Sequence, residues 1–128
     1  NYKLLTSIKG VGPITAIVML CSTLNFTKIT DHRKFACYCG LAPFEHSSGT
    51  SVRGGCHTSS MANRDIKVQL NRSALIAIRC DPQLKAYYER KVAEGKHKFS
   101  VLNAVRAKIA ARCFAVVRRG TPYVALQI

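Results

Sequence analysis

Apolar residues recur every three or four positions along most of the chain, the spacing that places them on one face of a helix. The clearest case is Ile66, Leu70, Ala74 and Ile78, which share one face of a long predicted helix. Glycine, proline and short polar residues mark the ends of each run, with Asp31 and Asn63 as predicted N-caps. This pattern predicts helices over Tyr2–Ile8, Pro13–Leu24, His32–Cys39, Asn63–Arg79, Pro82–Gly95 and Ser100–Arg119.

The segment Pro43–Ser60 does not follow the helical pattern. It is rich in serine, glycine and threonine and contains Ser47–Ser51 and Gly54-Gly55, which is the composition of a loop. No internal repeat or low-complexity linker divides the chain. We therefore predict one mainly α domain over residues 1–128: a helix-hairpin-helix over 5–24, a serine-bearing loop over 43–60 and a small bundle of longer helices, with little strand.

Composition narrows the partners that such a domain could bind. The chain has 128 residues, of which 48% are hydrophobic, enough for a core, but no apolar run reaches the length of a membrane span. Twenty Lys and Arg against six Asp and Glu give a net charge of +14, and no acidic residue follows Glu94. So basic a chain favours nucleic acid or an anionic membrane surface as its partner. Because it begins at Asn1 without a signal-peptide pattern, we expect a piece of a longer cytoplasmic protein.

The six cysteines allow two interpretations. They are Cys21, Cys37, Cys39, Cys56, Cys80 and Cys113. Most stand in apolar stretches, so we expect reduced thiols that act as small core hydrophobes. The alternative is a zinc site made by Cys37, Cys39, Cys56 and His57, although this spacing is not that of a zinc finger or ribbon.

The most specific local motif is Gly10-Val11-Gly12-Pro13, flanked by Leu5, Ile8 and Ala16. A Gly–apolar–Gly turn between two short helices is typical of a helix-hairpin-helix. Its glycines let the backbone approach a phosphate, and the N-terminus of the second helix then offers N–H groups. We predict DNA contacts by Lys9, Gly10, Val11 and Gly12. The alternative is an ordinary tight turn with no ligand.

Further basic residues are candidates for contacts with nucleic acid. Lys96 and Lys98 stand beside a predicted helix start, and Arg106 lies on the last helix. The cations of that helix do not all share one side, so they cannot all face one groove. We predict phosphate contacts by Lys96, Lys98 and Arg106.

Ser48-Gly49 lies in the polar loop with His46 and Arg53 nearby. A serine nucleophile needs groups that activate it and stabilise the charge on phosphorus, and these two side chains could supply part of that. The residues alone equally fit a plain turn without catalysis.

Several blocks, in this order and spacing, resemble the C-terminal transposase domain of insertion-sequence family one-ten, which includes Piv-type invertases and bridge-RNA-guided recombinases. The blocks are Ile8–Ala16, Gly40–Pro43, Ser48–Ser51, Asp81–Leu84, Tyr87-Tyr88, Gly95-Lys96 and Arg119–Tyr123. The resemblance implies that Ser48 attacks a DNA phosphodiester and holds it as a phosphoserine link, with Ser47 and Ser51 as near competitors. It further implies a bacterial, nucleoid-associated and homo-oligomeric parent protein, and leaves open whether a guide RNA is a partner.

Two departures qualify the resemblance. Ala62 stands where the family often has glycine. Family members also carry an N-terminal RuvC-like domain whose acidic residues hold divalent metal, whereas the six acids here are scattered. We expect no metal site or cofactor in this chain, Mg²⁺ in the missing domain, and no catalysis by this chain alone. The alternative function is a non-catalytic DNA-binding or assembly module.

Overall fold

The computed structural model describes residues 1–39 and 61–124, the side chains of residues 61–64 excepted. Within these ranges the chain forms helices and no strand, which confirms the predicted mainly α fold class. The helices are α1 (Tyr2–Thr6), α2 (Pro13–Ser22), α3 (His32–Tyr38), α4 (Met61–Cys80), α5 (Pro82–Ala93) and α6 (Lys98–Arg119). The loop predicted over 43–60 lies outside the described residues.

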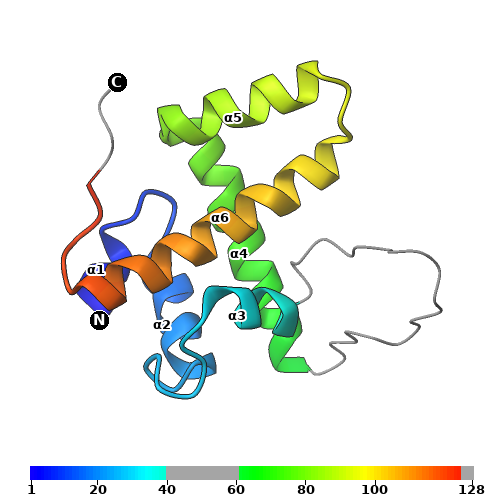
Figure 1. Ribbon diagram of the computed structural model, residues 1–128. Helices are drawn as coiled ribbons and strands as arrows, with labels where there is room; N and C mark the ends of the chain where they lie inside the picture. The colour runs from blue at the N-terminus through cyan, green and yellow to red at the C-terminus, as the bar shows by residue number, and fades with distance from the viewer. Residues whose placement is uncertain (40–60, 125–128) are drawn as a thin grey trace.

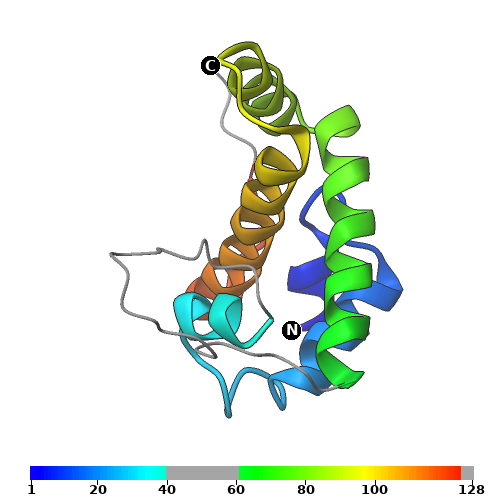
Figure 2. The same ribbon diagram turned by 90° about the vertical axis from the view of Figure 1, so that its right-hand side faces the viewer.

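The two long helices α4 and α6 form the centre of the fold (Figure 1). They contact each other, α2 and α5 pack on α4, and α6 also contacts α1, α3 and α5. The view turned by 90° shows α5 across one end of the α4–α6 pair, with the short helices toward the other end (Figure 2). The chain thus places α1 and the α5–α6 turn on opposite sides of the molecule (Figure 1).

The core lies between α4 and α6, where the predicted apolar faces meet. Ile66, Leu70 and Ala74 are buried and Ile78 is partly buried, as the four-residue spacing predicts. From α6 the fully or nearly buried side chains are Val101, Val105, Ile109, Ala110, Cys113, Phe114 and Val116. This burial, rather than helix propensity, stabilises the bundle.

Three phenylalanines join α3 and the preceding turn to α6. The Phe114 ring centroid lies 4.9 Å from that of Phe26, edge to face, and 5.3 Å from that of Phe35. Phe26 reaches this cluster from a turn in which Leu24, Asn25 and Phe26 all have positive φ, at 51°, 57° and 63°. Such a backbone costs a non-glycine residue about 1–2 kcal/mol. The buried Thr23 hydroxyl holds the turn by accepting from Phe26 N at 2.9 Å and donating to Met19 O at 2.7 Å.

Helix starts were predicted with mixed success. Asp31 caps α3 as expected, accepting from Arg33 N at 3.1 Å. The prediction that Asn63 caps α4 is wrong, because α4 begins at Met61 and Asn63 lies inside it. α6 begins at Lys98 rather than Ser100, with His97 as its N-cap: the imidazole Nδ1 accepts from Phe99 N at 3.1 Å. Histidine is an uncommon N-cap, so composition gave no sign of it.

The prediction that the cysteines are core residues holds for only part of the set. Cys39 and Cys113 are buried, and burial raises the pKa of each thiol to about 12, so both stay protonated and unreactive. Cys21, Cys37 and Cys80 are exposed, because each falls on the outer face of its helix or at a helix end. Cys56 lies outside the described residues.

Candidate nucleic-acid interface

The turn between α1 and α2 packs against α4. Gly10 has φ +96°, and a Cβ at this position would lie 2.7 Å from Ser73 O on α4. Val11 is buried, and its N–H donates to Ile8 O at 3.0 Å. The side chain and N–H of Val11 are therefore engaged inside the fold, and Gly10 is required by helix packing whether or not a phosphate binds.

The other half of the turn is open. Gly12 is the N-cap of α2 without a side-chain cap, a Cβ there would meet nothing within 4 Å, and no acidic residue stands in the first turn. Lys9 is exposed beside it. An uncompensated helix N-terminus with a nearby cation suits a phosphate. Among the predicted hairpin residues, Lys9 and Gly12 are thus accessible, and DNA contact by any of the four stays a prediction.

Arg106 is half-buried on α6. Its Nε is buried and meets no hydrogen-bond acceptor within the part of the chain that the structure describes. Burial lowers the pKa of its guanidinium from the ordinary value. A buried donor without an acceptor costs free energy, and contact of the Arg106 guanidinium with a phosphate stays a prediction.

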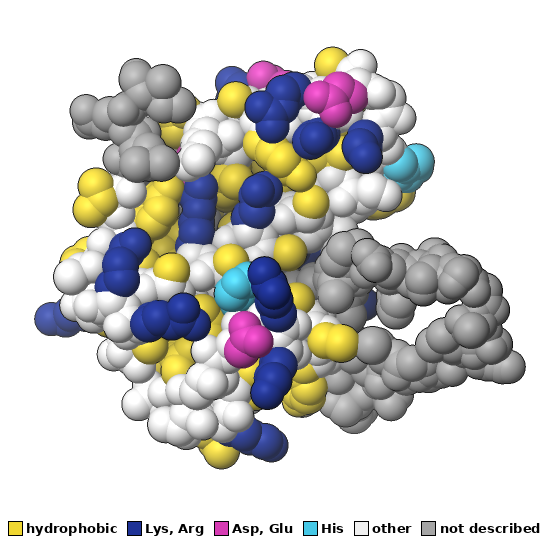
Figure 3. All heavy atoms as spheres, viewed as in Figure 1, with side chains coloured by type: hydrophobic (Ala, Val, Ile, Leu, Met, Phe, Trp, Pro, Cys, Tyr) yellow, Lys and Arg dark blue, Asp and Glu magenta, His cyan; other side chains and the backbone are white. Residues whose placement is uncertain are grey.

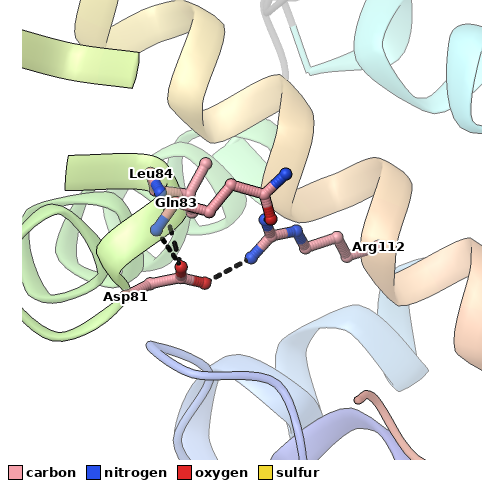
Figure 4. Close-up of polar contacts among 4 residues, drawn as sticks. All are labelled: Asp81, Gln83, Leu84 and Arg112. Atoms are coloured by element: carbon pink, nitrogen blue, oxygen red, sulfur yellow. Dashed lines mark hydrogen bonds and ion pairs between the residues drawn. The ribbon is translucent and has the colours of Figure 1, made fainter. Parts of the chain in front are cut away.

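Arg112 has a structural partner instead. Its Nη1 donates to Asp81 Oδ2 at 2.6 Å and its Nη2 donates to Gln83 Oε1 at 3.0 Å (Figure 4). The guanidinium also lies over the Tyr123 ring, 4.9 Å from its centroid. Arg112 is therefore occupied within the fold, unlike Arg106 on the same helix.

Asp81, the centre of this cluster, was not singled out as a cap or ion-pair partner from the sequence. Its side chain is 2% exposed, and its Oδ1 accepts from Gln83 N at 2.9 Å and Leu84 N at 3.4 Å, capping α5 (Figure 4). Burial alone would raise the pKa of Asp81, but the hydrogen bond and charge of Arg112 and the two N–H groups hold it below its ordinary value. Through Arg112, the block Asp81–Leu84 thus fixes the connection between α4 and α5 to α6.

A pocket of about 320 Å³ lies between the end of α2 and α3, and sequence reasoning missed it. Its lining residues are Ser22, Lys28, Ile29, Thr30, Lys34 and Tyr38. Two ammonium groups with three hydroxyls suit a phosphate group. The signal available in the sequence was two lysines and a hydroxyl residue around the Asp31 cap.

The α5–α6 turn exposes basic and aromatic side chains together. Lys96 and Lys98 are exposed, as DNA-contact candidates must be. Between and after them, His97 and Phe99 stack with ring centroids 5.3 Å apart and planes 27° apart. Sequence reasoning named the two lysines but missed Phe99, whose signal is an aromatic side chain inside a basic run. Figure 3 shows Lys and Arg side chains over α5 and the adjoining part of α6, as over the rest of this face.

The predicted catalytic residues Ser48, His46 and Arg53 lie outside the described residues, as do Cys56 and His57 of the zinc alternative. In residues 1–39 and 65–124, no three His, Cys, Asp or Glu side chains gather as metal ligands would. Asp81 is further committed to Arg112 and to the N-terminus of α5. Asp81 is therefore not free to bind Mg²⁺, and the absence of a metal site from this chain stays a prediction.

No helix within the described ranges combines the length and apolarity that crossing a bilayer requires.

Comparison with known proteins identifies the family. Residues 2–89 match the model of the transposase IS116/IS110/IS902 family. An uncharacterized 43.6 kDa protein of insertion element IS110 from Streptomyces coelicolor is 39% identical over 120 residues, 93% of this chain and 29% of that protein. The pilin gene-inverting protein of Moraxella lacunata is 26% identical over 126 residues, 96% of this chain and 39% of its own.

A third relative is the uncharacterized 42 kDa protein of insertion element IS900 from Mycobacterium paratuberculosis. It is 30% identical over 111 residues, 85% of this chain and 28% of that protein. The chain therefore spans less than two-fifths of the length of these relatives. The match nevertheless covers both the α1–α2 turn and the serine-bearing segment 43–60. The chain belongs to the transposase IS116/IS110/IS902 family.

Proposed function

We propose that this chain is the serine-bearing, DNA-binding part of a transposase or site-specific recombinase. The observation that carries the proposal is the family match over residues 2–89, which contains Ser48. Two relatives named pilin gene-inverting proteins favour rearrangement of DNA over other uses of DNA binding. In a bacterial cell the protein would act in the cytoplasm, at the nucleoid.

In the proposed reaction, Ser48 Oγ attacks the phosphorus of a DNA phosphodiester. An Oγ–P bond forms, one phosphorus–oxygen ester bond breaks, and the serine proton passes to the leaving strand end, with His46 as the candidate carrier. Arg53 would stabilise the charge that develops on the phosphoryl oxygens. Attack by a second strand end reverses these steps and frees the serine. The number of phosphoester bonds is unchanged throughout, so strand exchange needs no ATP.

Binding of DNA would be shared among several separate cationic sites. They are Lys9 with the start of α2, Lys28 and Lys34 in the pocket between α2 and α3, Lys96 and Lys98 at the α5–α6 turn, and Arg106 on α6. If about six of these cations contact phosphates, the logarithm of duplex affinity should fall with the logarithm of salt concentration with a slope near −5. A slope near zero would exclude nucleic acid as the partner.

The metal chemistry belongs, in this proposal, to a separate acidic domain that holds Mg²⁺. Assembly of more than one protomer would bring two duplexes together, and a guide RNA is a further candidate partner.

The test is Ser48→Ala in the protein at its natural length, with Ser47→Ala and Ser51→Ala as matched controls. We expect Ser48→Ala to bind DNA with wild-type affinity and to lose recombination by at least a thousandfold, while both controls stay active. In the wild-type protein, mass spectrometry of a trapped and digested reaction should find a nucleotide on the peptide Phe44–Arg53. Full recombination by Ser48→Ala with no adduct would leave the chain a DNA-binding or assembly module.

A further inference from the structure

Phe99 is a large apolar side chain that the fold leaves exposed to solvent. It lies in the first turn of α6, its side chain is 73% exposed, and its ring stacks on His97. Single exposed apolar side chains are common on protein surfaces, so this ring indicates a binding site only together with its stacking on His97 and the cations around it. A flat apolar ring is well suited to stacking on another ring.

The two rings are held before any ligand arrives. His97 Nδ1 accepts from Phe99 N at 3.1 Å, which fixes the imidazole as the N-cap of α6. The Phe99 ring lies stacked on this imidazole, with 5.3 Å between the two centroids. Because the cap already fixes the imidazole, less conformational entropy is lost when a ligand stacks on this ring pair.

Positive charge surrounds this ring pair. Lys96 and Lys98 flank His97 and are exposed. Farther along the α5–α6 hairpin, the Tyr87 ring gathers three cations: Lys108 Nζ at 4.6 Å, Arg90 Cζ at 5.7 Å and Lys91 Nζ at 6.0 Å from its centroid.

Two acids of the same hairpin oppose this charge only in part. Glu94 is paired with Lys91 at 3.5 Å, and Glu89 is exposed. Cations remain in excess across the hairpin surface (Figure 3). An apolar protein partner would use the exposed ring but would have no need of this charge.

We propose that the α5–α6 hairpin binds unpaired nucleotides of a single-stranded DNA or RNA. One base stacks on the Phe99–His97 pair, Lys96 and Lys98 contact the adjoining phosphates, and the cations around Tyr87 contact the next phosphates along the strand. In a duplex the base faces are covered by neighbouring bases, so an aromatic platform is useful only for an unpaired base. This inference rests on the proposed function in one respect, namely that the partner is nucleic acid.

The experiment measures binding of fluorescent 20-nucleotide single-stranded DNA, RNA of the same sequence and the matching duplex to the protein at its natural length. We expect Phe99→Leu to weaken binding of unpaired strands about tenfold and duplex binding less than twofold. Phe99→Tyr, which keeps the ring, should bind as the wild type does. The double change Lys96→Gln, Lys98→Gln should reduce the salt slope for single strands by about 1.4. A strand carrying 2-aminopurine should change its fluorescence on binding the wild type but not Phe99→Leu.

Tyr2→Leu and Lys3→Gln are matched controls, since both residues are exposed on α1 at the other side of the molecule. Neither should change the affinity for single strands. The ratio of DNA to RNA affinity identifies the source of the unpaired strand. Wild-type affinity of Phe99→Leu for single strands, or equal losses for single strands and duplex, would overturn the inference while leaving the proposed function intact. Failure of the wild type to bind any of the three would instead overturn the proposed function.

Discussion

Two turns of this chain share a backbone conformation and differ in their surroundings. Gly10, between α1 and α2, and Gly95, between α5 and α6, both have φ +96°. A Cβ on Gly10 would lie 2.7 Å from Ser73 O and 3.1 Å from Ala77 Cβ, whereas a Cβ on Gly95 would meet nothing within 4 Å. One glycine is needed for backbone conformation and packing together, and the other for conformation alone.

The comparison shows that a motif and an accessible surface are different things. The turn whose sequence most suggests a phosphate site uses Gly10 and Val11 to pack against the core, and only Gly12 and Lys9 remain open. The turn after Gly95 matches no hairpin motif but presents both lysines and two stacked rings to solvent. Burial therefore has to be known before a glycine-rich turn is assigned to a ligand.

The largest predicted effect separates the two glycines. Gly10→Ala combines a left-handed backbone, which costs a non-glycine residue about 1–2 kcal/mol, with a clash against α4 that costs about 1–3 kcal/mol more. We expect it to lower the free energy of unfolding by about 3 kcal/mol, measured by urea denaturation.

Gly95→Ala is the matched control, because its φ is the same and its surroundings are empty. We expect a loss of about 1–2 kcal/mol from the backbone term alone. Equal losses of unfolding free energy for the two variants would show that Gly10 does not pack closely on α4. Gly10 would then be accessible to a ligand, as the hairpin motif predicts.

The next effect concerns the Asp81–Arg112 ion pair, which connects the start of α5 to α6. Asp81→Asn keeps an N-cap for α5 but removes the charge that Arg112 contacts. Hydrogen bonds to charged groups contribute about 1.5–3 kcal/mol, so we expect a loss of about 2 kcal/mol at pH 7. Because aspartate and asparagine have nearly the same shape, the loss of unfolding free energy measures the effect of the charge rather than of packing.

The same variant has a defined pH dependence. The pKa of Asp81 is lowered in the folded protein, so its contribution is complete above the unfolded value near 4 and is lost as the pH falls through the folded value. The difference in unfolding free energy between wild type and Asp81→Asn should therefore shrink as the pH falls below about 4. Urea titrations between pH 7 and pH 2 measure this difference, and a constant difference would contradict the assigned ion pair.

Much of the fold was predictable because helix periodicity is a local property. The buried faces of α4 and α6 followed from residue spacing, and Asp31 was recognised as a cap. Asn63 was misplaced because a preferred cap residue also occurs inside helices. The exposed cysteines were missed because a small apolar residue says little about which helix face it occupies.

The candidate site was less predictable, since it depends on contacts between distant residues. Arg106 and Arg112 are equivalent cations in the sequence, yet Arg112 pairs with Asp81, thirty-one positions away, while Arg106 Nε meets no acceptor in the described structure. The stacking of His97 and Phe99 depends on His97 acting as a cap. The Arg112–Asp81 pair arises only when the helices pack, whereas the His97–Phe99 stacking is local to the start of α6.

The smallest predicted effect concerns the α5–α6 hairpin, where three cations lie around the ring of Tyr87. Tyr87→Leu removes the ring that faces Lys108 at 4.6 Å, and an exposed cation–π contact is worth about 0.5–1 kcal/mol. Tyr87 is also partly packed on the core, so a double-mutant cycle with Lys108→Gln is needed to isolate the pair. We expect urea denaturation to give a coupling energy of about 0.5 kcal/mol between Tyr87 and Lys108. A second cycle that starts from Tyr87→Phe, which keeps the ring, should give the same coupling energy. If coupling is absent in both backgrounds, the Tyr87 ring does not hold Lys108, and the hairpin's cations are positioned by their helices alone.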